Sequence, residues 1–204
     1  MRLIGMLDSP YVRRVAITLR MAGIPFTHEP LSVLREVEAF RAVNPVVKAP
    51  TLITDAGITL MDSTLILAHL AELHPGRARL MPTAPEAHAQ ACRILGLALA
   101  AADKTVQLVY ERNLRPEEKR HAPWLDRIEG QLAAAYAELE REVGTQGPWL
   151  FGSAPLQPDI TAAVVYRFTP SIRNEAVSEV EHPNLAALCD RAEALPAFQA
   201  CPFR

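Results

Sequence analysis

The spacing of hydrophobic residues changes near residue 80, and this change constrains the fold more than any other feature of the chain. Up to that point, short apolar runs alternate with segments of helical periodicity, whereas the remainder is almost entirely helical in pattern. Three prolines fall within residues 75–85, between the two patterns, and such a stretch is typical of a linker. The sequence therefore predicts two domains, at residues 1–80 and 86–204.

The first domain is predicted to follow the order β-α-β-α-β-β-α. An apolar run at 2–7 indicates a strand, and the helical face that follows Ser9-Pro10 continues until Gly23 and Pro25. The later elements are a strand at 26–31, a charged helix at 35–43, two strands joined by a glycine-containing turn at 51–61, and a helix at 62–73. This alternation predicts an α/β domain.

The second domain is predicted to be a bundle of helices. Long helices are expected at 85–113 and 124–143, and shorter ones at about 158–170 and 184–194. Five residues share one stripe of the second long helix: Trp124, Ile128, Leu132, Ala135 and Leu139. Such a stripe is expected to face the core of a bundle.

Charge and hydropathy argue against two classes of partner. The 204 residues carry a formal net charge of -2 with a pI near 6.3, and no dense run of Lys and Arg occurs, so we expect no nucleic-acid partner. No segment approaches the ~20 apolar residues that span a bilayer, and the apolar run at the amino terminus is too short for a secretory signal. We therefore expect a cytoplasmic protein that does not contact membranes.

The spacing of cysteines and histidines argues against disulfides and against a metal centre. Cys92, Cys189 and Cys201 are odd in number, far apart and without CxxC spacing, so we expect three structural thiols. The six histidines show no HExxH or comparable pattern. The sequence predicts no bound metal.

Ser9-Pro10 stands where the first strand gives way to the first helix, and two interpretations fit it. Serine is a favoured N-cap and proline a favoured first helical residue, so the pair is explained fully as a helix start, with Ser9 contributing about 1 kcal/mol. The same geometry directs a hydroxyl and unpaired backbone N–H groups beyond the helix, where an anion is favoured. Arg13 and Arg14 oppose the helix dipole in the first turn, which slightly favours a bound anion. We expect at least one of these arginines to be a solvated surface residue.

Two further segments carry distinctive residues at the starts of elements. Pro50 directly precedes a predicted strand, so it must occupy the first position of that strand or a turn, and local chemistry alone favours a trans bond before it. Asp62 and Ser63 stand at the head of a helix, where both are ordinary caps. In the alternative interpretation, Ser63 and the helix N-terminus hold a carboxylate while Asp62 pairs with an ammonium, so that together they bind an amino-acid head.

Six segments, in order, resemble the soluble glutathione transferase family of the bacterial type: SPYVRRVAITLRMAGIPF, NPVVKAPTL, MDSTLILAHL, GPWLFGSAPLQPDITAAV, HPNL and LPAF. The match covers nearly the whole chain. The resemblance implies a thioredoxin-like α/β domain, an all-α helical-bundle domain on the side of the acceptor substrate, a homodimer, and glutathione bound as co-substrate mainly by the first domain. It also implies that the bond before Pro50 is cis.

The resemblance assigns roles to the residues at matching positions. Ser9 matches the catalytic serine, which donates a hydrogen bond to the glutathione sulfur. The other glutathione-binding positions are Lys48 near the glycyl carboxylate, Ala49 pairing through its backbone with the cysteine, and Asp62 and Ser63 at the γ-glutamyl end. Two residues match structural positions: Pro50, and Asp159 at the start of a core helix in the second domain.

The second domain departs from the family pattern near Asp159. The family usually has Ser or Thr three residues earlier, forming a capping box, whereas this chain has Leu156. We therefore expect Gln157 to be the cap and Pro158 the first helical residue, with Asp159 favouring the helix dipole from the first turn.

Two departures concern the first domain. Val46-Val47 stands where a Leu-Gly pair is common, which affects the path of the loop that carries Lys48. Relatives that catalyse thiol–disulfide exchange have cysteine at the position of Ser9. A covalent mixed disulfide with residue 9 is therefore excluded.

The resemblance implies an enzyme of detoxification, a glutathione S-transferase that activates glutathione as a thiolate and conjugates it to a small hydrophobic electrophile. Two alternatives stay open. One is a non-catalytic glutathione-binding or regulatory protein with the same fold, and the other is a glutathione-dependent peroxidase or isomerase. The second domain determines the acceptor, and its helix faces do not follow from the sequence.

Overall fold

The contacts of the chain divide it into two units, and the division differs from the expected one at the C-terminal end. The computed structural model describes residues 1–144, 147–172 and 178–203. The first unit comprises residues 1–80 together with those from Ala194 onward, and the second comprises Met81–Glu193. The helical pattern after residue 80 predicted that this C-terminal segment belongs to the helical domain. It groups with the first unit because Phe198 is fully buried there against Arg13, whose guanidinium carbon lies 5.5 Å from the ring centroid.

A mixed sheet with the strand order β2-β1-β3-β4 forms the centre of the first unit. Its strands are β1 (Arg2–Ile4), β2 (Thr27–Glu29), β3 (Thr51–Ile53) and β4 (Thr59–Met61). β1 and β2 run parallel, while β3 is antiparallel to both β1 and β4. Thr51 pairs with Ile4 on one side and with Met61 on the other. The end of β1, the start of β3 and the end of β4 therefore lie at the same end of the sheet.

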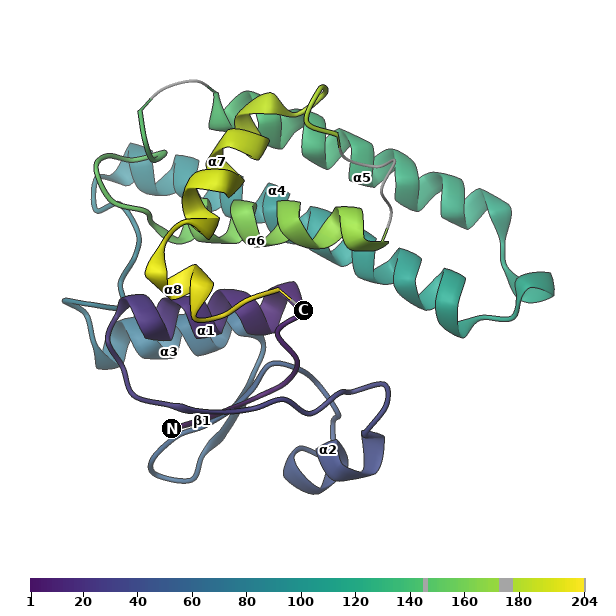
Figure 1. Ribbon diagram of the computed structural model, residues 1–204, viewed down its shortest axis with the longest axis horizontal. Coiled ribbons are helices and arrows are strands. Elements are labelled where there is room, and N and C mark those ends of the chain that lie inside the picture. Colours follow the sequence, from purple (N-terminus) through teal and green to yellow (C-terminus); the bar gives the residue numbers. More distant parts are fainter. Residues whose placement is uncertain (145–146, 173–177, 204) are drawn as a thin grey trace. The chain divides into compact units, whose positions relative to one another are not determined.

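Two helices of the first unit, α1 (Pro10–Met21) and α3 (Ser63–Leu73), pack side by side, and α2 (Val37–Val43) lies apart from them (Figure 1). The short C-terminal helix α8 (Pro196–Gln199) contacts α1. Beyond α8, the carbonyl oxygen of Cys201 accepts a hydrogen bond of 2.8 Å from Nε of Arg13. The predicted order β-α-β-α-β-β-α is confirmed, and the first unit has the thioredoxin-like fold.

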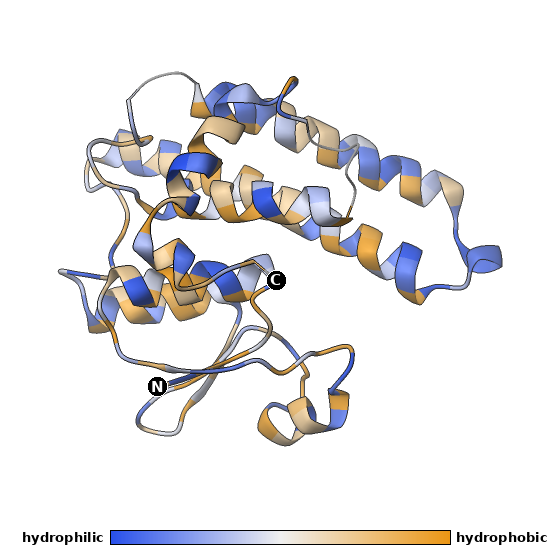
Figure 2. Cartoon of the chain, in the orientation of Figure 1, coloured by the Kyte–Doolittle hydropathy of each residue, from blue (hydrophilic) through white to orange (hydrophobic). Residues whose placement is uncertain are grey.

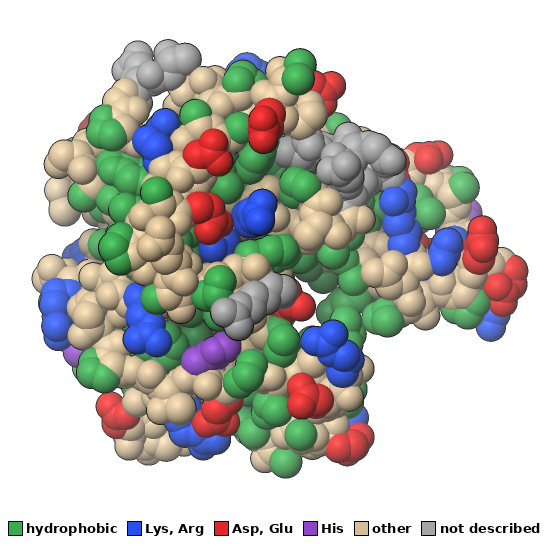
Figure 3. Space-filling view, in the orientation of Figure 1, with side chains coloured by type: hydrophobic (Ala, Val, Ile, Leu, Met, Phe, Trp, Pro, Cys, Tyr) green, Lys and Arg blue, Asp and Glu red, His purple; other side chains and the backbone are tan. Residues whose placement is uncertain are grey.

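Four long helices build the described part of the second unit: α4 (Pro85–Val109), α5 (Ala122–Val143), α6 (Gln157–Ile172) and α7 (Pro183–Glu193). α4 and α5 form a hairpin, joined through a π-helical turn at Tyr110–Leu114 and a 3-10 turn at Glu117–Lys119. Acidic and basic side chains gather at the tip of this hairpin (Figure 3). α6 packs on both α4 and α7. The predicted all-α second domain is confirmed.

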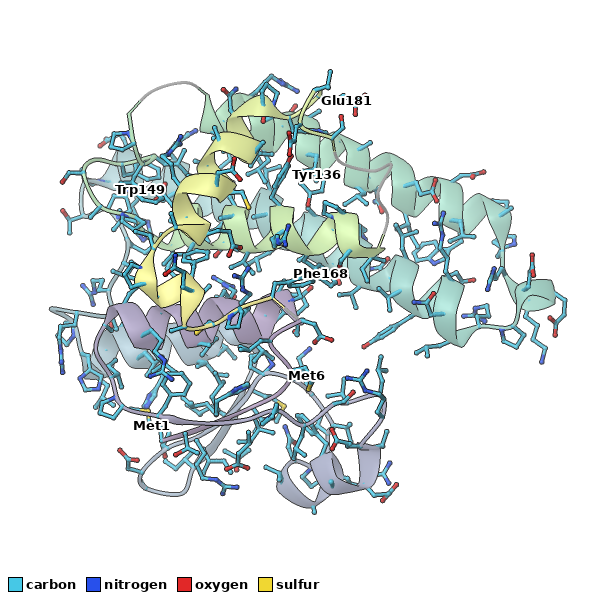
Figure 4. All side chains as sticks on the ribbon, in the orientation of Figure 1. Met1, Met6, Tyr136, Trp149, Phe168 and Glu181 are labelled. Atoms are coloured by element: carbon cyan, nitrogen blue, oxygen red, sulfur yellow. The ribbon has the colours of Figure 1, made fainter. Side chains whose placement is uncertain are left out.

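A chain of buried hydroxyl groups joins three helices of this unit. Tyr136 of α5, labelled in Figure 4, is fully buried, and its hydroxyl donates to Oγ1 of Thr169 in α6 at 2.6 Å. That oxygen lies 2.9 Å from Oγ1 of Thr105 in α4. Burial raises the pKa of Tyr136. The hydrogen-bonded chain therefore satisfies polar groups that would otherwise be costly inside a helical core.

The apolar stripe predicted for α5 is buried except at its first residue. Ile128, Leu132, Ala135 and Leu139 are buried, whereas Trp124 is 41% exposed. Hydrophobic and hydrophilic segments alternate along this helix, as expected when one face is covered (Figure 2). Trp124 differs from the other four in lying in the first turn of α5, next to the connection from α4.

α6 begins one residue earlier than expected. Gln157 is its first residue, and Ile160 N donates to the carbonyl oxygen of Leu156 at 3.0 Å, so Leu156 rather than Gln157 is the cap. Asp159 is fully buried and accepts hydrogen bonds from the backbone N–H groups of Leu156 at 2.9 Å and Leu150 at 2.8 Å. Burial raises the pKa of Asp159, and these two hydrogen bonds oppose that shift. The carboxylate of Asp159 thus provides hydrogen-bond acceptors for backbone N–H groups at and before the start of α6, without a capping hydroxyl.

The three cysteines are free thiols in the structure. Cys189 and Cys201 are buried, whereas Cys92 is exposed on α4, so packing accounts only for the first two. Among residues 1–144, 147–172 and 178–203, no three His, Cys, Asp or Glu side chains are grouped as metal ligands. No helix in these ranges has both the length and the apolar character that crossing a membrane requires.

Candidate functional site

The three segments singled out from the sequence meet at one end of the sheet in the first unit. Ser9 follows β1, Pro50 precedes β3 and Asp62 follows β4. Because β3 is antiparallel to both of its neighbours, these three junctions lie side by side. Met6, which is labelled in Figure 4, lies in the stretch between β1 and Ser9.

Gly5 allows two of these segments to approach each other closely. A Cβ atom on Gly5 would lie 2.6 Å from Cγ2 of Val12 and 3.1 Å from Cβ of Ala49. Its φ of 137° is also one that residues with side chains rarely adopt. The first turn of α1 and the loop before Pro50 therefore pack against a position that only glycine fits.

Ser9 is the N-cap of α1, with Pro10 in the first turn, as predicted. Its Oγ accepts a hydrogen bond from Val12 N at 3.4 Å, near the long limit for such a bond. The Ser9 hydroxyl donates no hydrogen bond to a described residue, so its proton is available to a ligand. The sequence did not single out the neighbouring Asp8 as part of this end of the sheet. The pKa of its carboxyl is raised by burial, and the positive charge of Arg35 opposes this shift.

The Ala49–Pro50 peptide bond is cis, as the resemblance implies. Ala49 is half-buried, and its backbone N–H and C=O form no hydrogen bond with the described residues. An extended peptide can pair with such free backbone groups. Ala49 thus presents the groups that its predicted role requires.

The loop before Ala49 is held by buried polar side chains. Asn44 is 1% exposed, donates from Nδ2 to Oγ1 of Thr51 at 2.9 Å and accepts from Val46 N at 3.0 Å. Thr51 in turn donates to the carbonyl oxygen of Lys48 at 2.7 Å. Val47 has a φ of 54°, in the left-handed region. The backbone at Lys48 is therefore fixed, while its side chain is exposed at the same end of the sheet.

Asp62 is the N-cap of α3 and has a φ of 71°. One carboxylate oxygen, Oδ1, accepts both capping hydrogen bonds, from Thr64 N at 2.8 Å and Leu65 N at 3.3 Å. The other oxygen, Oδ2, forms no hydrogen bond with the described residues. The cap interpretation and the ammonium-binding interpretation are therefore compatible, because they use different oxygens.

Ser63 follows as the first residue of α3 and is 4% exposed. Its Oγ accepts a hydrogen bond of 3.2 Å from Nη1 of Arg14, and the same nitrogen lies 3.4 Å from Oγ1 of Thr64. Arg14 therefore links the first turn of α1 to the start of α3. The pKa of Arg14 is lowered to about 10, mainly by burial, and the negative charge of Asp62 opposes this shift.

The expectation that at least one of Arg13 and Arg14 is a solvated surface residue is wrong. Arg13 is 0% exposed and Arg14 is 3% exposed. Arg13 is covered by the C-terminal segment and Arg14 by the start of α3, both of which are distant in sequence. The only local signal for Arg14 was the unfavourable position of a cation in the first turn of a helix.

Two family models match the chain. The N-terminal domain of glutathione S-transferases matches residues 3–78, and the C-terminal domain of glutathione S-transferases matches residues 122–191.

Solved structures and a curated protein are similar over nearly the whole chain. A glutathione S-transferase from Methylobacterium radiotolerans, in complex with glutathione sulfonate, is 34% identical with a TM-score of 0.90 and covers 100% of this chain and 95% of its own. A glutathione transferase family member from Pseudomonas fluorescens, with bound glutathione, is 27% identical with a TM-score of 0.80, covering 98% and 97%. Maleylacetoacetate isomerase of Pseudomonas aeruginosa is 28% identical over 200 residues, which covers 91% of this chain and 88% of the relative.

Each of the two units thus matches the corresponding domain of one family, and a solved member of that family aligns from end to end at 34% identity. This chain belongs to the glutathione S-transferase family.

Proposed function

We propose that this protein is a glutathione transferase that activates glutathione as a thiolate and conjugates it to a small hydrophobic electrophile. The proposal rests on one observation: the free hydroxyl proton of Ser9, the free backbone of Ala49, and the Asp62–Ser63 pair converge at one end of the sheet. Relatives solved with glutathione or glutathione sulfonate support this choice of ligand. We place the protein in the cytoplasm.

The proposed pose of glutathione follows from the charges along this end of the sheet. The γ-glutamyl head is zwitterionic, so its carboxylate binds Ser63 and its ammonium binds Oδ2 of Asp62. The cysteine backbone pairs with Ala49, and the glycyl carboxylate lies near Lys48. This arrangement brings the sulfur to Ser9 at the N-terminus of α1, where the helix dipole favours an anion.

Stabilising the thiolate is the catalytic task, because a free thiol with a pKa of about 8.5 is mostly protonated at neutral pH. Lowering that pKa by about 2 units requires a preference of ~2.7 kcal/mol for the charged form. A hydrogen bond to a charged group contributes about 1.5–3 kcal/mol, and a helix N-terminus about 0.3–1 kcal/mol. Ser9 and the start of α1 together supply a stabilisation of the required size.

The test compares Ser9→Ala and Ser9→Asp with the unmodified protein by following the thiolate absorbance of bound glutathione against pH. Ser9→Ala removes the O–H but keeps the helix N-terminus, so glutathione should still bind while its thiol pKa rises by about one unit, or ~1.4 kcal/mol. Ser9→Asp should raise the thiol pKa further, because its carboxylate repels the thiolate even though it caps the helix well.

Melting curves for each variant separate the effect on the thiol from the effect on the cap. Ser171→Ala, in the second unit, is the matched control and should leave the thiol pKa unchanged. If Ser9→Asp matches the unmodified protein in both stability and thiol pKa, Ser9 is only a cap, and the activating group must be sought elsewhere.

A second candidate, glutathione-dependent isomerisation, is favoured by the similarity to maleylacetoacetate isomerase over 91% of this chain. The two activities share the thiolate and differ in the acceptor. A turnover screen across electrophiles, peroxides and cis-olefinic acids, run on protein retained by immobilised glutathione, separates conjugation, peroxide reduction and isomerisation. Retention without turnover of any of these would instead identify a non-catalytic glutathione-binding protein.

A further inference from the structure

Arg14 is a buried cation whose hydrogen-bond acceptors are neutral. It is 3% exposed, and its Nη1 donates to the hydroxyl oxygens of Ser63 at 3.2 Å and Thr64 at 3.4 Å. Its Nε is buried without a hydrogen-bond partner among the described residues. Within those residues Arg14 also forms no ion pair with a carboxylate.

This arrangement is costly unless an anion completes it. A buried charge is retained in proteins when it is paired and hydrogen-bonded, and an unpartnered polar atom in the interior is destabilising. The nearby carboxylate of Asp62 compensates only in part, because its Oδ1 is engaged by the N–H groups of Thr64 and Leu65. The positive charge of Arg14 at the start of α3 is thus only partly balanced by the groups around it.

The hydrogen bond from Arg14 also sets the direction of the Ser63 hydroxyl. A serine hydroxyl has one proton to donate and two lone pairs that accept. Because Oγ of Ser63 accepts the guanidinium N–H, its own proton points elsewhere, and it donates no hydrogen bond to a described residue. Ser63 is therefore oriented as a donor to an anion at the N-terminus of α3, where the helix dipole favours the same charge.

We propose that Arg14 is a positioning residue for the γ-glutamyl carboxylate of glutathione: it orients the Ser63 hydroxyl toward that carboxylate and balances its charge from within the protein. This inference rests on the proposed function. It adds a specificity element, because a ligand that lacks this carboxylate gains nothing from Arg14. The zwitterionic head is thereby recognised by Arg14 behind Ser63 on the carboxylate side and by Asp62 on the ammonium side.

A purely structural role predicts a different outcome. If Arg14 only joins α1 to α3, its loss loosens the whole end of the sheet and weakens every ligand equally. If it acts through Ser63 on the carboxylate, its loss weakens only ligands that carry that group. The ratio of two affinities therefore distinguishes the roles, whatever the change in stability.

Calorimetric titration of the full chain with two ligands provides this ratio: glutathione, and an analogue in which γ-aminobutyrate replaces the γ-glutamyl residue and removes only its carboxylate. Arg14→Met should weaken glutathione by about 10- to 100-fold, the range for hydrogen bonds to charged groups, and the analogue by less than about twofold. Arg14→Lys keeps the charge but loses the planar fork, so it should restore part of the glutathione affinity without changing that of the analogue.

Arg13→Met is the matched control, since Arg13 is the adjacent, equally buried arginine and contacts Phe198 and Cys201 instead. It should lower the melting temperature without changing the affinity ratio. Equal losses for both ligands in Arg14→Met, or in Arg14→Lys if the Met variant does not fold, would overturn the role of Arg14. Failure of the unmodified protein to bind glutathione would instead overturn the proposed function, and with it the inference.

Discussion

Val47 adopts a backbone conformation that its side chain disfavours. A φ of 54° is uncommon for any residue with a Cβ atom and is a marked outlier for a β-branched one. The loop nevertheless keeps this path, because Asn44 and Thr51 bind its backbone on either side. Its conformation at residue 47 is one that glycine adopts freely, which fits the Leu-Gly pair common at this place in the family.

Val47→Gly should therefore stabilise the protein. Relief of the left-handed strain is of order 1–3 kcal/mol, and the added freedom of glycine in the unfolded chain offsets about 0.5–1 kcal/mol of it, so we expect a net gain of about 1 kcal/mol. Urea denaturation measures this difference. Val46→Gly is the control: the residue type is the same, but without a positive φ, and it should destabilise. A less stable Val47→Gly variant would show that the strain is not significant.

Two polar residues of the candidate site could be predicted as helix caps, because caps are local signals. Ser9 and Asp62 each stand at the start of a helical period, and the structure places both at N-caps. Arg14 was misjudged for the opposite reason, since its partner Ser63 lies 49 residues away and only the folded sheet brings the two together. The position of Arg14 near the start of a helix indicated an unusual cation, but it did not indicate that the start of α3 covers it.

At the scale of elements, the strands and helices of the first unit were predicted in order because their periodicities are local. The start of α6 was not, because it depends on Asp159 accepting a hydrogen bond from Leu150, nine residues away in a connecting segment. A carboxylate that binds two backbone N–H groups fixes both the helix start and the segment before it. Local capping rules consider only the first of these.

Replacement of Asp159 should therefore cost more than the loss of an ordinary cap. Asp159→Ala leaves the N–H groups of Leu150 and Leu156 unpaired beside a fully buried position, and each such group costs about 1–3 kcal/mol. We expect a loss of about 2–4 kcal/mol in the free energy of unfolding, measured by chemical denaturation. Asp126→Ala, at an exposed position of α5, should change it by less than about 0.5 kcal/mol. A loss as small as that of the control would contradict this account of α6.

At the scale of the whole molecule, the sequence anticipated a boundary near residue 80 from its prolines but not the return of the C-terminal segment to the first unit. Phe198 is one apolar residue among many in the sequence, and nothing near it specifies its partner. Its burial against Arg13 depends on contacts that span most of the chain. Such long-range packing leaves no local pattern to read.

We also expect two copies of the chain to associate. α4 is rich in alanine, and small side chains allow close approach of helices, while α3 exposes Leu65 at 66% and Leu73 at 53%. Light scattering at micromolar concentration should give about twice the chain mass of 22.4 kDa, and Leu65→Glu should shift the mass toward the monomer. A value near 22.4 kDa for the unmodified protein would rule out the dimer under these conditions.

The return of the C-terminal segment to the first unit has a consequence for biosynthesis. Residues 1–80 leave the ribosome well before the residues that cover Arg13, because Phe198 and Cys201 lie more than 180 residues further along the chain. At about 5–20 residues per second, synthesis of the intervening Met81–Glu193 takes on the order of ten seconds. During that interval Arg13 and the apolar surface of α1 in the nascent first domain lack the residues that bury them in the folded chain. The first unit is therefore completed only after the second has been synthesised, and a stop codon placed just before Phe198 should impair the domain that was made first.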